Sequence, residues 1–309
     1  MALTIATNNA ALNAAAAASS VNRDMETSMA RLSSGKRINS ASDDAAGVAI
    51  SSRLSAEIRG TDQAIRNALD GQALIDTAEG AHKEIENILQ RMREIAVQSA
   101  NDTNSFVDRS NLSQELIALQ IEMNRISKST AWAGQSLFTG GTANDGVGSS
   151  HMIANAGSTQ EFTFHVDAGV SSLSQVTVKI EAIDSVALGV AGVNEAMLLY
   201  PPHISTTLTA FADSKESHDW VIGTLDNALA HLNTYRASLG AISNRLNYTV
   251  NNLTNISTNL SAAKGSIEDT DFAKETTDLA KNQILQQAST AMLAQANASK
   301  QNVLSLLQG

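Results

Sequence analysis

Proline constrains the fold of this chain more than any other residue type. The 309 residues include two prolines, and these are adjacent, at Pro201 and Pro202. Proline lacks the backbone N–H that a helix needs, and its ring clashes with the preceding helical turn. The long stretches before and after this pair are therefore free to form helices of unusual length.

The composition favours thin helical packing and excludes several functions. Hydrophobic residues make up 43% of the chain but aromatic residues only 4%, so small and aliphatic side chains supply most of the apolar surface. Cysteine is absent, which excludes disulfides and thiolate metal sites. The net charge of −10 argues against a basic nucleic-acid interface. No run of about 18 apolar residues is present, so membrane insertion is not expected.

The first 34 residues favour a helix, because four apolar residues step by four, four and three: Val21, Met25, Met29 and Leu32. Gly35 predicts its end. Residues 36–44 are interpreted as a connector, in which Ser40 and Asp43 approximate a capping box for the next helix. The adjacent carboxylates at positions 43 and 44 are therefore interpreted as helix caps, not as catalytic or metal-binding groups.

A second helix is expected from about residue 44 to residue 100. Its core positions alternate steps of three and four, an average of 3.5 that is typical of coiled coils. These positions are Ile75, Ala78, His82, Ile85, Leu89, Met92, Ala96 and Ser99. His82 lies on this stripe and is interpreted as a packed core histidine. A polar turn at 101–105 predicts an antiparallel third helix with a similar stripe: Leu112, Leu116, Leu119, Met123, Ile126 and Thr130.

The middle of the chain differs from both arms. Residues 134–160 are rich in Gly, Ser, Thr and Asn, which indicates a loop. Residues 162–166 and 176–180 alternate apolar and polar side chains, which predicts a β-hairpin over about 161–183. Residues 187–217 contain the prolines and show little periodicity.

A fourth helix is expected over about 219–260, because leucine recurs there every seven residues without a miss. These leucines are the predicted coiled-coil core: Leu225, Leu232, Leu239, Leu246, Leu253 and Leu260. The polar run 265–271 is expected to break this helix, and a last helix is expected over about 272–307. The predicted fold class is mainly α, with long antiparallel coiled-coil rods from both chain ends and a small β-hairpin between them.

Four blocks carry a resemblance to bacterial flagellins: residues 32–47, 90–101, 284–297 and 303–307. The resemblance covers roughly residues 1–140 and 219–309. Two features depart from the family pattern. Lys300 stands where many members have proline, which would let the last helix continue, and the centre is too short for large outer domains.

The resemblance implies three regions. These are an inner terminal coiled-coil domain of residues 1–43 and 268–309, a helical rod domain of residues 44–186 and 218–267, and a short variable surface segment, 187–217. The side chains expected to mediate filament assembly are Val21, Met25, Met29, Leu32, Ile38, Leu285, Met292, Leu293, Val303, Leu304 and Leu307.

The same resemblance implies a partner set and a location. The expected function is a structural subunit of the extracellular flagellar filament, with no enzyme activity and no cofactor. Expected partners are other copies of the chain, an export chaperone at the C-terminal region, and the hook-associated junction and cap proteins. The start of the chain lacks a basic segment and an apolar signal core, so no cleaved signal peptide is expected. The resemblance implies export in the unfolded state by the flagellar type III system.

A receptor surface is also implied by the second block. This block resembles part of the surface that an animal Toll-like receptor senses, and the matching residues are Arg91, Ile95 and Glu122, with Gln90 and Glu94 beside them. The same residues are a possible surface between subunits. An exposed arginine could donate two hydrogen bonds to a partner. The alternative is an ordinary solvated face of a rod.

Two other functions compete with the filament subunit. A hook–filament junction protein would share related chain ends, but the two C-terminal blocks favour a flagellin. A secreted helical toxin or translocator would need a long apolar hairpin, which the sequence lacks. No histidine pair has metal-ligand spacing on a helix, and no phosphate loop or nucleophile elbow is present.

Overall fold

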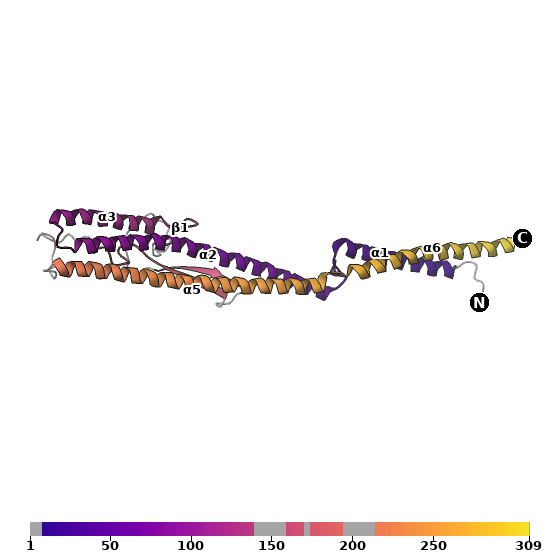
Figure 1. The fold of residues 1–309 in the computed structure, drawn as a ribbon. Coiled ribbons are helices and arrows are strands. Elements are labelled where there is room, and N and C mark those ends of the chain that lie inside the picture. The colour runs from indigo at the N-terminus through magenta and orange to yellow at the C-terminus, as the bar shows by residue number, and fades with distance from the viewer. Residues whose placement is uncertain (1–7, 139–158, 170–173, 194–213, 309) are drawn as a thin grey trace, which may run out of the picture. The chain divides into compact units, whose positions relative to one another are not determined.

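The computed structural model describes residues 8–138, 159–169, 174–193 and 214–308 (Figure 1). In the helix that begins at Ser214, side chains are described from residue 218 onward, and in the last helix they are described up to residue 299. The fold is mainly α, as predicted. The elements are α1 (Asn9–Ser34), α2 (Ala45–Ser99), α3 (Phe106–Ser129), β1 (Ala131–Trp132), β2 (Gln135–Ser136), β3 (Thr159–His165), β4 (Gln175–Glu181), α5 (Ser214–Glu268) and α6 (Phe272–Gln308).

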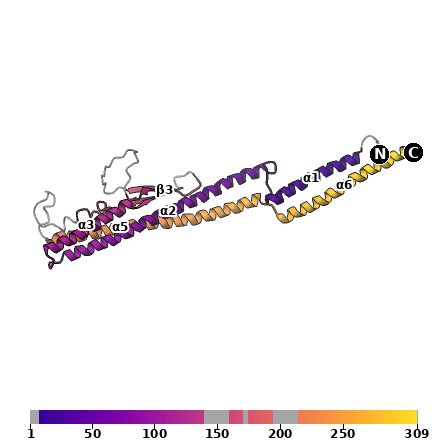
Figure 2. The same cartoon turned by 90° about the horizontal axis from the view of Figure 1, so that it is seen from above.

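Contacts divide the chain into two compact units. The terminal unit contains residues 1–59 and 257–309, and the rod unit contains residues 60–256. Helices α2 and α5 contribute residues to both units. Within the terminal unit α1 runs beside α6, and within the rod unit α2, α3 and α5 run side by side (Figures 1 and 2). The inner-domain and rod-domain bounds inferred from the sequence stay a prediction.

The position of the first connector agrees with the sequence-based expectation, but the residue that caps α2 does not. Gly35 ends α1 with a left-handed φ of 69°, as glycine at this position favours. The expected capping box at Ser40 is wrong, because α2 begins after Asp44, whose Oδ1 accepts a hydrogen bond from the Gly47 amide at 2.9 Å. The Asp43 carboxylate instead accepts from the Ser40 amide at 2.9 Å, one turn earlier.

The coiled-coil core of the rod unit follows the predicted periodicity. All eight predicted stripe positions of α2 are buried, including His82. On α5, Leu225, Leu232, Leu239, Leu246 and Leu253 are buried, whereas Leu260, in the terminal unit, is partly exposed. Helix α3 adds Leu116 and Met123 to the same core. Strict heptad spacing therefore identified the seam along which α2 and α5 pack.

The break after α5 falls within the predicted run 265–271, but α5 itself extends beyond its expected end at about residue 260. Gly265 does not end the helix, since it is absent from the glycines that adopt positive φ, and α5 continues to Glu268. A glycine inside a helix costs about 1 kcal/mol relative to alanine, which neighbouring turns can offset. Asp271 then starts α6 by accepting a hydrogen bond from the Ala273 amide at 2.9 Å. Helix α6 runs on past Lys300 to Gln308, as the absence of proline predicted.

The predicted hairpin is confirmed as the antiparallel pair β3–β4. Val176, Val178 and Ile180 of β4 are buried in the rod core. The β3 backbone is joined to α2 because the Asn67 amide donates to the His165 carbonyl at 2.9 Å. Gly71 of α2 leaves room for Phe164, since a Cβ at this glycine would lie 3.2 Å from its ring.

Two middle segments differ from the expected loops. Residues 131–136 form a small hairpin, β1–β2, whose turn places Ala133 and Gly134 at positive φ. Of the rest of the expected loop, Leu137 and Phe138 are buried, residues 159–160 belong to β3, and residues 139–158 lie outside the described part of the chain. Of the expected surface segment 187–217, the first residues join the core, since Val190 and Val193 are fully buried, and 194–213 lie outside the described residues.

His82 is a buried, neutral histidine in the rod core. It is 1% exposed, and its ring lies 5.3 Å from that of Phe138. Neither ring nitrogen has a hydrogen-bond partner among the described residues. Burial, with a smaller contribution from the charge of Arg236, lowers the pKa of His82 to about 4. Arg236 is itself held by Glu79 and Glu86 of α2.

We predict that Leu232→Ala destabilises the rod unit by about 2–5 kcal/mol, because it removes a fully buried side chain from a packed seam. Urea unfolding followed by circular dichroism measures this loss. Leu260→Ala is the matched control on the same heptad stripe, and it should cost less because Leu260 is partly exposed. Equal losses in the two variants would contradict the assignment of the core.

His82 should make the rod unit sensitive to mild acid. Its pKa is about 4 when folded, against 6.5 for the free side chain, so the unfolded chain binds the proton more readily. The stability that depends on neutral His82 is complete above pH 6.5 and is lost as the pH falls towards 4. Between pH 7 and pH 5 we expect a loss of about 2 kcal/mol in the free energy of unfolding. Urea unfolding at each pH measures it, and His82→Leu should remove this part of the pH dependence.

Candidate assembly surface

The two chain ends are held together by their connectors. The Arg37 amide donates to the Glu268 carbonyl at 2.6 Å, and the Thr270 amide donates to the Gly35 carbonyl at 3.0 Å. The Lys36 ammonium lies 3.1 Å from the Glu268 carboxylate. These contacts join the end of α1 to the start of α6 through backbone atoms, so they do not depend on long flexible side chains alone.

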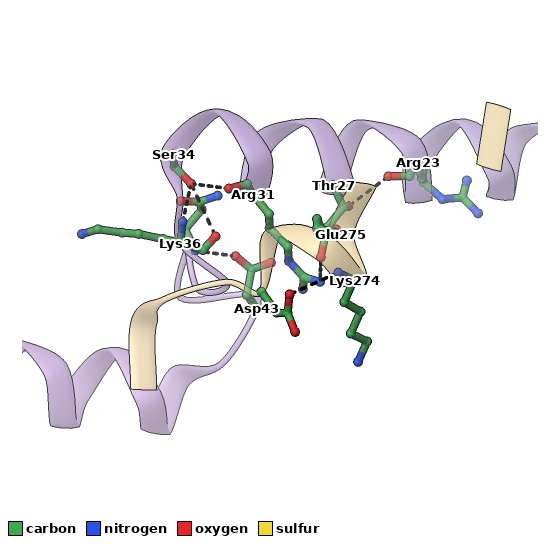
Figure 3. Close-up of polar contacts among 10 residues, drawn as sticks. Arg23, Thr27, Arg31, Ser34, Lys36, Asp43, Lys274 and Glu275 are labelled. Carbon is green, nitrogen blue, oxygen red and sulfur yellow. Dashed lines mark hydrogen bonds and ion pairs between the residues drawn. The ribbon is translucent and has the colours of Figure 1, made fainter. Parts of the chain in front are cut away.

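Polar contacts continue along the pair of terminal helices. Next to the connectors, the Arg31 guanidinium lies 4.0 Å from the buried Glu275 carboxylate, and Figure 3 shows the two side chains pointing toward one another. Further along, the Gln286 amide donates to Asn22 Oδ1 at 2.8 Å. Near the far end, the Asn8 amide donates to the Ala296 carbonyl at 3.1 Å. The helices therefore run antiparallel along most of α1.

This helix pair has almost no apolar core. Among the described residues of the terminal unit, the buried ones are Ser28, Ile38, Gly47, Ser51 and Glu275. Ile38 is the one large apolar side chain in this set. A pair of helices without a buried apolar seam gains little from packing, and the hydrophobic effect supplies most of the stability of folded proteins.

The apolar side chains of the pair are instead exposed to solvent. On α6, Ile284 is 66% exposed and Met292 is 65% exposed, and both lie on one face because they are eight residues apart. Leu285 lies next to this face and is also exposed. Leu12 and Met29 of α1 and Phe272 at the start of α6 are more than half exposed. The pair therefore presents apolar surface that a partner could cover.

Charge is also missing from this surface. No Asp, Glu, Lys or Arg occurs in residues 9–22 of α1 or in residues 282–299 of α6. Covering these segments would require no charged group to lose its water, which is the largest cost of burying polar surface. Apart from Lys300, the charged residues of the terminal helices lie nearer the connectors, as Arg31 and Glu275 do in Figure 3.

The structure distributes the predicted assembly residues over three environments. Ile38 is buried; Val21, Met25, Leu32 and Leu293 are partly exposed; and Met29, Leu285 and Met292 are exposed. Val303, Leu304 and Leu307 fall in α6 beyond its described side chains. The sequence-based set omitted Leu12, Phe272 and Ile284. The spacing of Ile284, Ala288 and Met292 by four residues is the signal that could have identified the α6 face.

The predicted receptor surface is only partly exposed. Ile95 is fully buried in the rod core, so its placement on that surface is wrong. It follows Met92 by three residues, and this spacing puts both side chains on the core side of α2. Gln90, Arg91, Glu94 and Glu122 do have exposed or partly exposed side chains.

The charged residues of the predicted receptor surface form ion pairs within the chain. Arg91 donates to Glu115 at 2.7 Å and to Glu94 at 3.0 Å. The hydrogen bond to Glu115, followed by that to Glu94, raises the pKa of Arg91. Glu122 accepts from Arg125 at 2.5 Å, which lowers the pKa of Glu122. Sequence reasoning missed Glu115, because its position opposite Arg91 depends on the register between α2 and α3.

The described part of the chain offers no centre for metal chemistry. No three His, Cys, Asp or Glu side chains come together there in a group that could hold an ion. In the same residues, no helical segment combines the length and the apolar character needed to cross a bilayer. What the geometry does offer is an uncharged, partly apolar surface on two paired helices.

Comparisons with known proteins agree on one family. Residues 5–143 match the bacterial flagellin N-terminal helical region, and residues 222–307 match the bacterial flagellin C-terminal helical region. Flagellin A of Vibrio cholerae serotype O1 is 37% identical over 385 residues, covering 100% of both chains. Flagellin of Bacillus subtilis is 39% identical over 308 residues, covering 97% of this chain and 98% of the relative.

A solved structure shares the fold. It is described as a flagellar hook-associated protein from Vibrio parahaemolyticus, and its TM-score with this chain is 0.59. The likeness covers 74% of this chain and 100% of that one at 16% sequence identity. At this identity the likeness concerns the fold alone.

Proposed function

The chain belongs to the bacterial flagellin family, and we propose that it polymerises through the surface that α1 and α6 leave uncovered. As a flagellin it is a structural subunit of the extracellular flagellar filament and not an enzyme. This assembly route is supported by the near absence of an apolar core in the terminal unit. Ile38 is the one large apolar side chain that is buried among its described residues.

The terminal helices need copies of the chain to bury their apolar surface. Fully burying one large apolar side chain contributes about 1.5–3 kcal/mol. Six such side chains on α1 and α6 are exposed: Leu12, Met29, Phe272, Ile284, Leu285 and Met292. Their burial would contribute on the order of 10 kcal/mol before the entropic cost of association. Ordering of the terminal helices and assembly would then be coupled.

The exposed apolar surface of the terminal helices is consistent with the expected export route and with the expected partners. A subunit whose ends gain their packing from other copies can pass unfolded through a narrow type III export channel, without a cleaved signal peptide. A chaperone bound to the C-terminal region would cover α6 and prevent early polymerisation. The junction and cap proteins would bind the terminal helices at the two ends of the filament. In this proposal residues 1–43 and 268–309 form the inner layer, and residues 44–186 and 218–267 form the rod outside it.

Receptor contact is proposed for a reduced set of residues. Gln90, Arg91, Glu94 and Glu122 are at least partly exposed, whereas Ile95 is buried and is left out. A receptor would have to compete with Glu115 for the Arg91 guanidinium. Comparing the receptor-activating potency of wild-type chain with that of Arg91→Ala would test this, and equal potency would contradict it.

We predict that Ile284→Glu/Met292→Glu prevents polymerisation, because it places two carboxylates on the apolar face of α6. Purified chain seeded with filament fragments should form long tubes in the electron microscope, and the variant should stay in the supernatant after sedimentation. Asn111→Glu/Gln114→Glu adds the same charge to exposed positions of α3 and serves as the control. Long tubes from the α6 variant would contradict the proposed surface, and short capped structures from wild-type chain would favour a junction protein.

Protease protection should report the coupling of order to assembly. Residues 1–40 and 270–309 contain several trypsin sites, among them Arg31, Lys36 and Lys274. We expect rapid cleavage at these sites in the monomer and at least tenfold slower cleavage in the polymer, because assembly removes the unfolded state that proteases need. Mass spectrometry of timed digests measures both rates. The same rates in both states would contradict coupled ordering.

A further inference from the structure

The methionines of the described residues divide between the two units by exposure. Met92 and Met123 are fully buried in the rod core. Met29 of α1 and Met292 of α6 are more than half exposed, and Met25 of α1 is partly exposed. The rod core therefore shields the sulfur atoms of Met92 and Met123 from solvent, whereas the terminal helices present methionine on the surface proposed for assembly.

Met292 lies where a change of polarity would alter the surface of α6 most. It shares an exposed face with Ile284 and Ala288, and residues 282–299 carry no charge. Met29 lies in a similar way on the apolar stripe of α1. A thioether is apolar and flexible, so methionine adapts well to irregular contact surfaces. Both side chains therefore suit burial against another copy as long as their sulfur atoms stay reduced.

A peroxide can change both side chains without a catalyst. The thioether sulfur attacks one oxygen of hydrogen peroxide, so that an S–O bond forms and the O–O bond breaks. The hydroxide that leaves takes up the proton of the transferred oxygen and becomes water. The sulfur gives up two electrons, and these reduce the peroxide. The product, methionine sulfoxide, is polar and disrupts interfaces that contain methionine. The chain has no cysteine that could compete for the oxidant.

We propose that Met29 and Met292 are an oxidation site that controls assembly, because a peroxide converts them to sulfoxides in the free chain and thereby prevents polymerisation. This inference rests on the proposed function, since it requires that other copies cover α1 and α6. Burying a polar S–O group removes its water and costs free energy unless a donor replaces that water. Assembly before oxidation has the opposite result, since copies that cover the two sulfurs also exclude the peroxide. Methionine sulfoxide reductases remove the added oxygen, so the block is reversible.

Oxidation rates at single methionines test the difference in exposure. Monomer and polymer are treated with hydrogen peroxide, and mass spectrometry of timed digests measures the sulfoxide at each position. In the monomer, Met29 and Met292 should oxidise at least tenfold faster than Met92 and Met123, whose sulfurs the rod core covers. In the polymer, the rates at Met29 and Met292 should fall at least tenfold. Similar rates at all four positions in the monomer, or unchanged rates in the polymer, would overturn the inference.

Seeded polymerisation of oxidised monomer tests the consequence for assembly. Peroxide should raise the critical concentration of the wild-type chain at least tenfold, and methionine sulfoxide reductases should restore it. Met29→Leu/Met292→Leu is the matched control, because leucine keeps the apolar surface, lacks sulfur and leaves every other methionine in place. The same peroxide treatment should change the critical concentration of this variant less than twofold.

The outcomes separate this inference from the proposed function. An equal rise in the critical concentration of the wild-type chain and the leucine variant would assign the effect to other residues and overturn the inference. A wild-type chain that polymerises equally well before and after peroxide treatment would overturn the inference alone. An untreated wild-type chain that never polymerises would overturn the proposed function and the oxidation site with it.

Discussion

The pairing of the two connectors is the constraint on which the rest of the structure depends. It brings residues more than 200 positions apart into contact through backbone hydrogen bonds, as between Arg37 and Glu268. Because the connectors meet, α1 and α6 leave this point side by side. Residues from both chain ends therefore form one surface, in which polar contacts such as that between Gln286 and Asn22 set the register of the two helices.

Stability and assembly are divided along the same helix. Leu253 of α5 is buried in the rod unit, whereas Leu260, the next leucine in the heptad, is partly exposed in the terminal unit. The heptad continues in sequence after the layers that bury it have ended. The rod unit can thus be stable in a single chain because α2, α3 and β3–β4 cover α5. In the terminal unit the α1–α6 pair buries no large apolar side chain of its own among the described residues, so its apolar residues are available to copies of the chain.

Periodicity predicted most of the fold because spacing along a helix decides which side chains face the same way. It identified the long helices, the leucine seam, the buried position of His82 and the β3–β4 hairpin. It did not identify features that depend on distant contacts. Glycine often ends helices, yet α5 continues past Gly265 to Glu268. Glu115 meets Arg91 only through the register of α2 against α3. The error at Ile95 was avoidable, since its spacing from Met92 already indicates the core.

Charge distribution adds information that periodicity lacks. Heptad spacing shows which face of a helix points inward but treats every outward face as solvent-exposed. In a chain with a net charge of −10, an outward face without charge is unexpected if water is its only neighbour. Such faces occur on α1 and on α6, whereas α2 carries charges along its length. A polymer of strongly acidic subunits has to bring some surfaces into contact, and repulsion is weakest where carboxylates are missing.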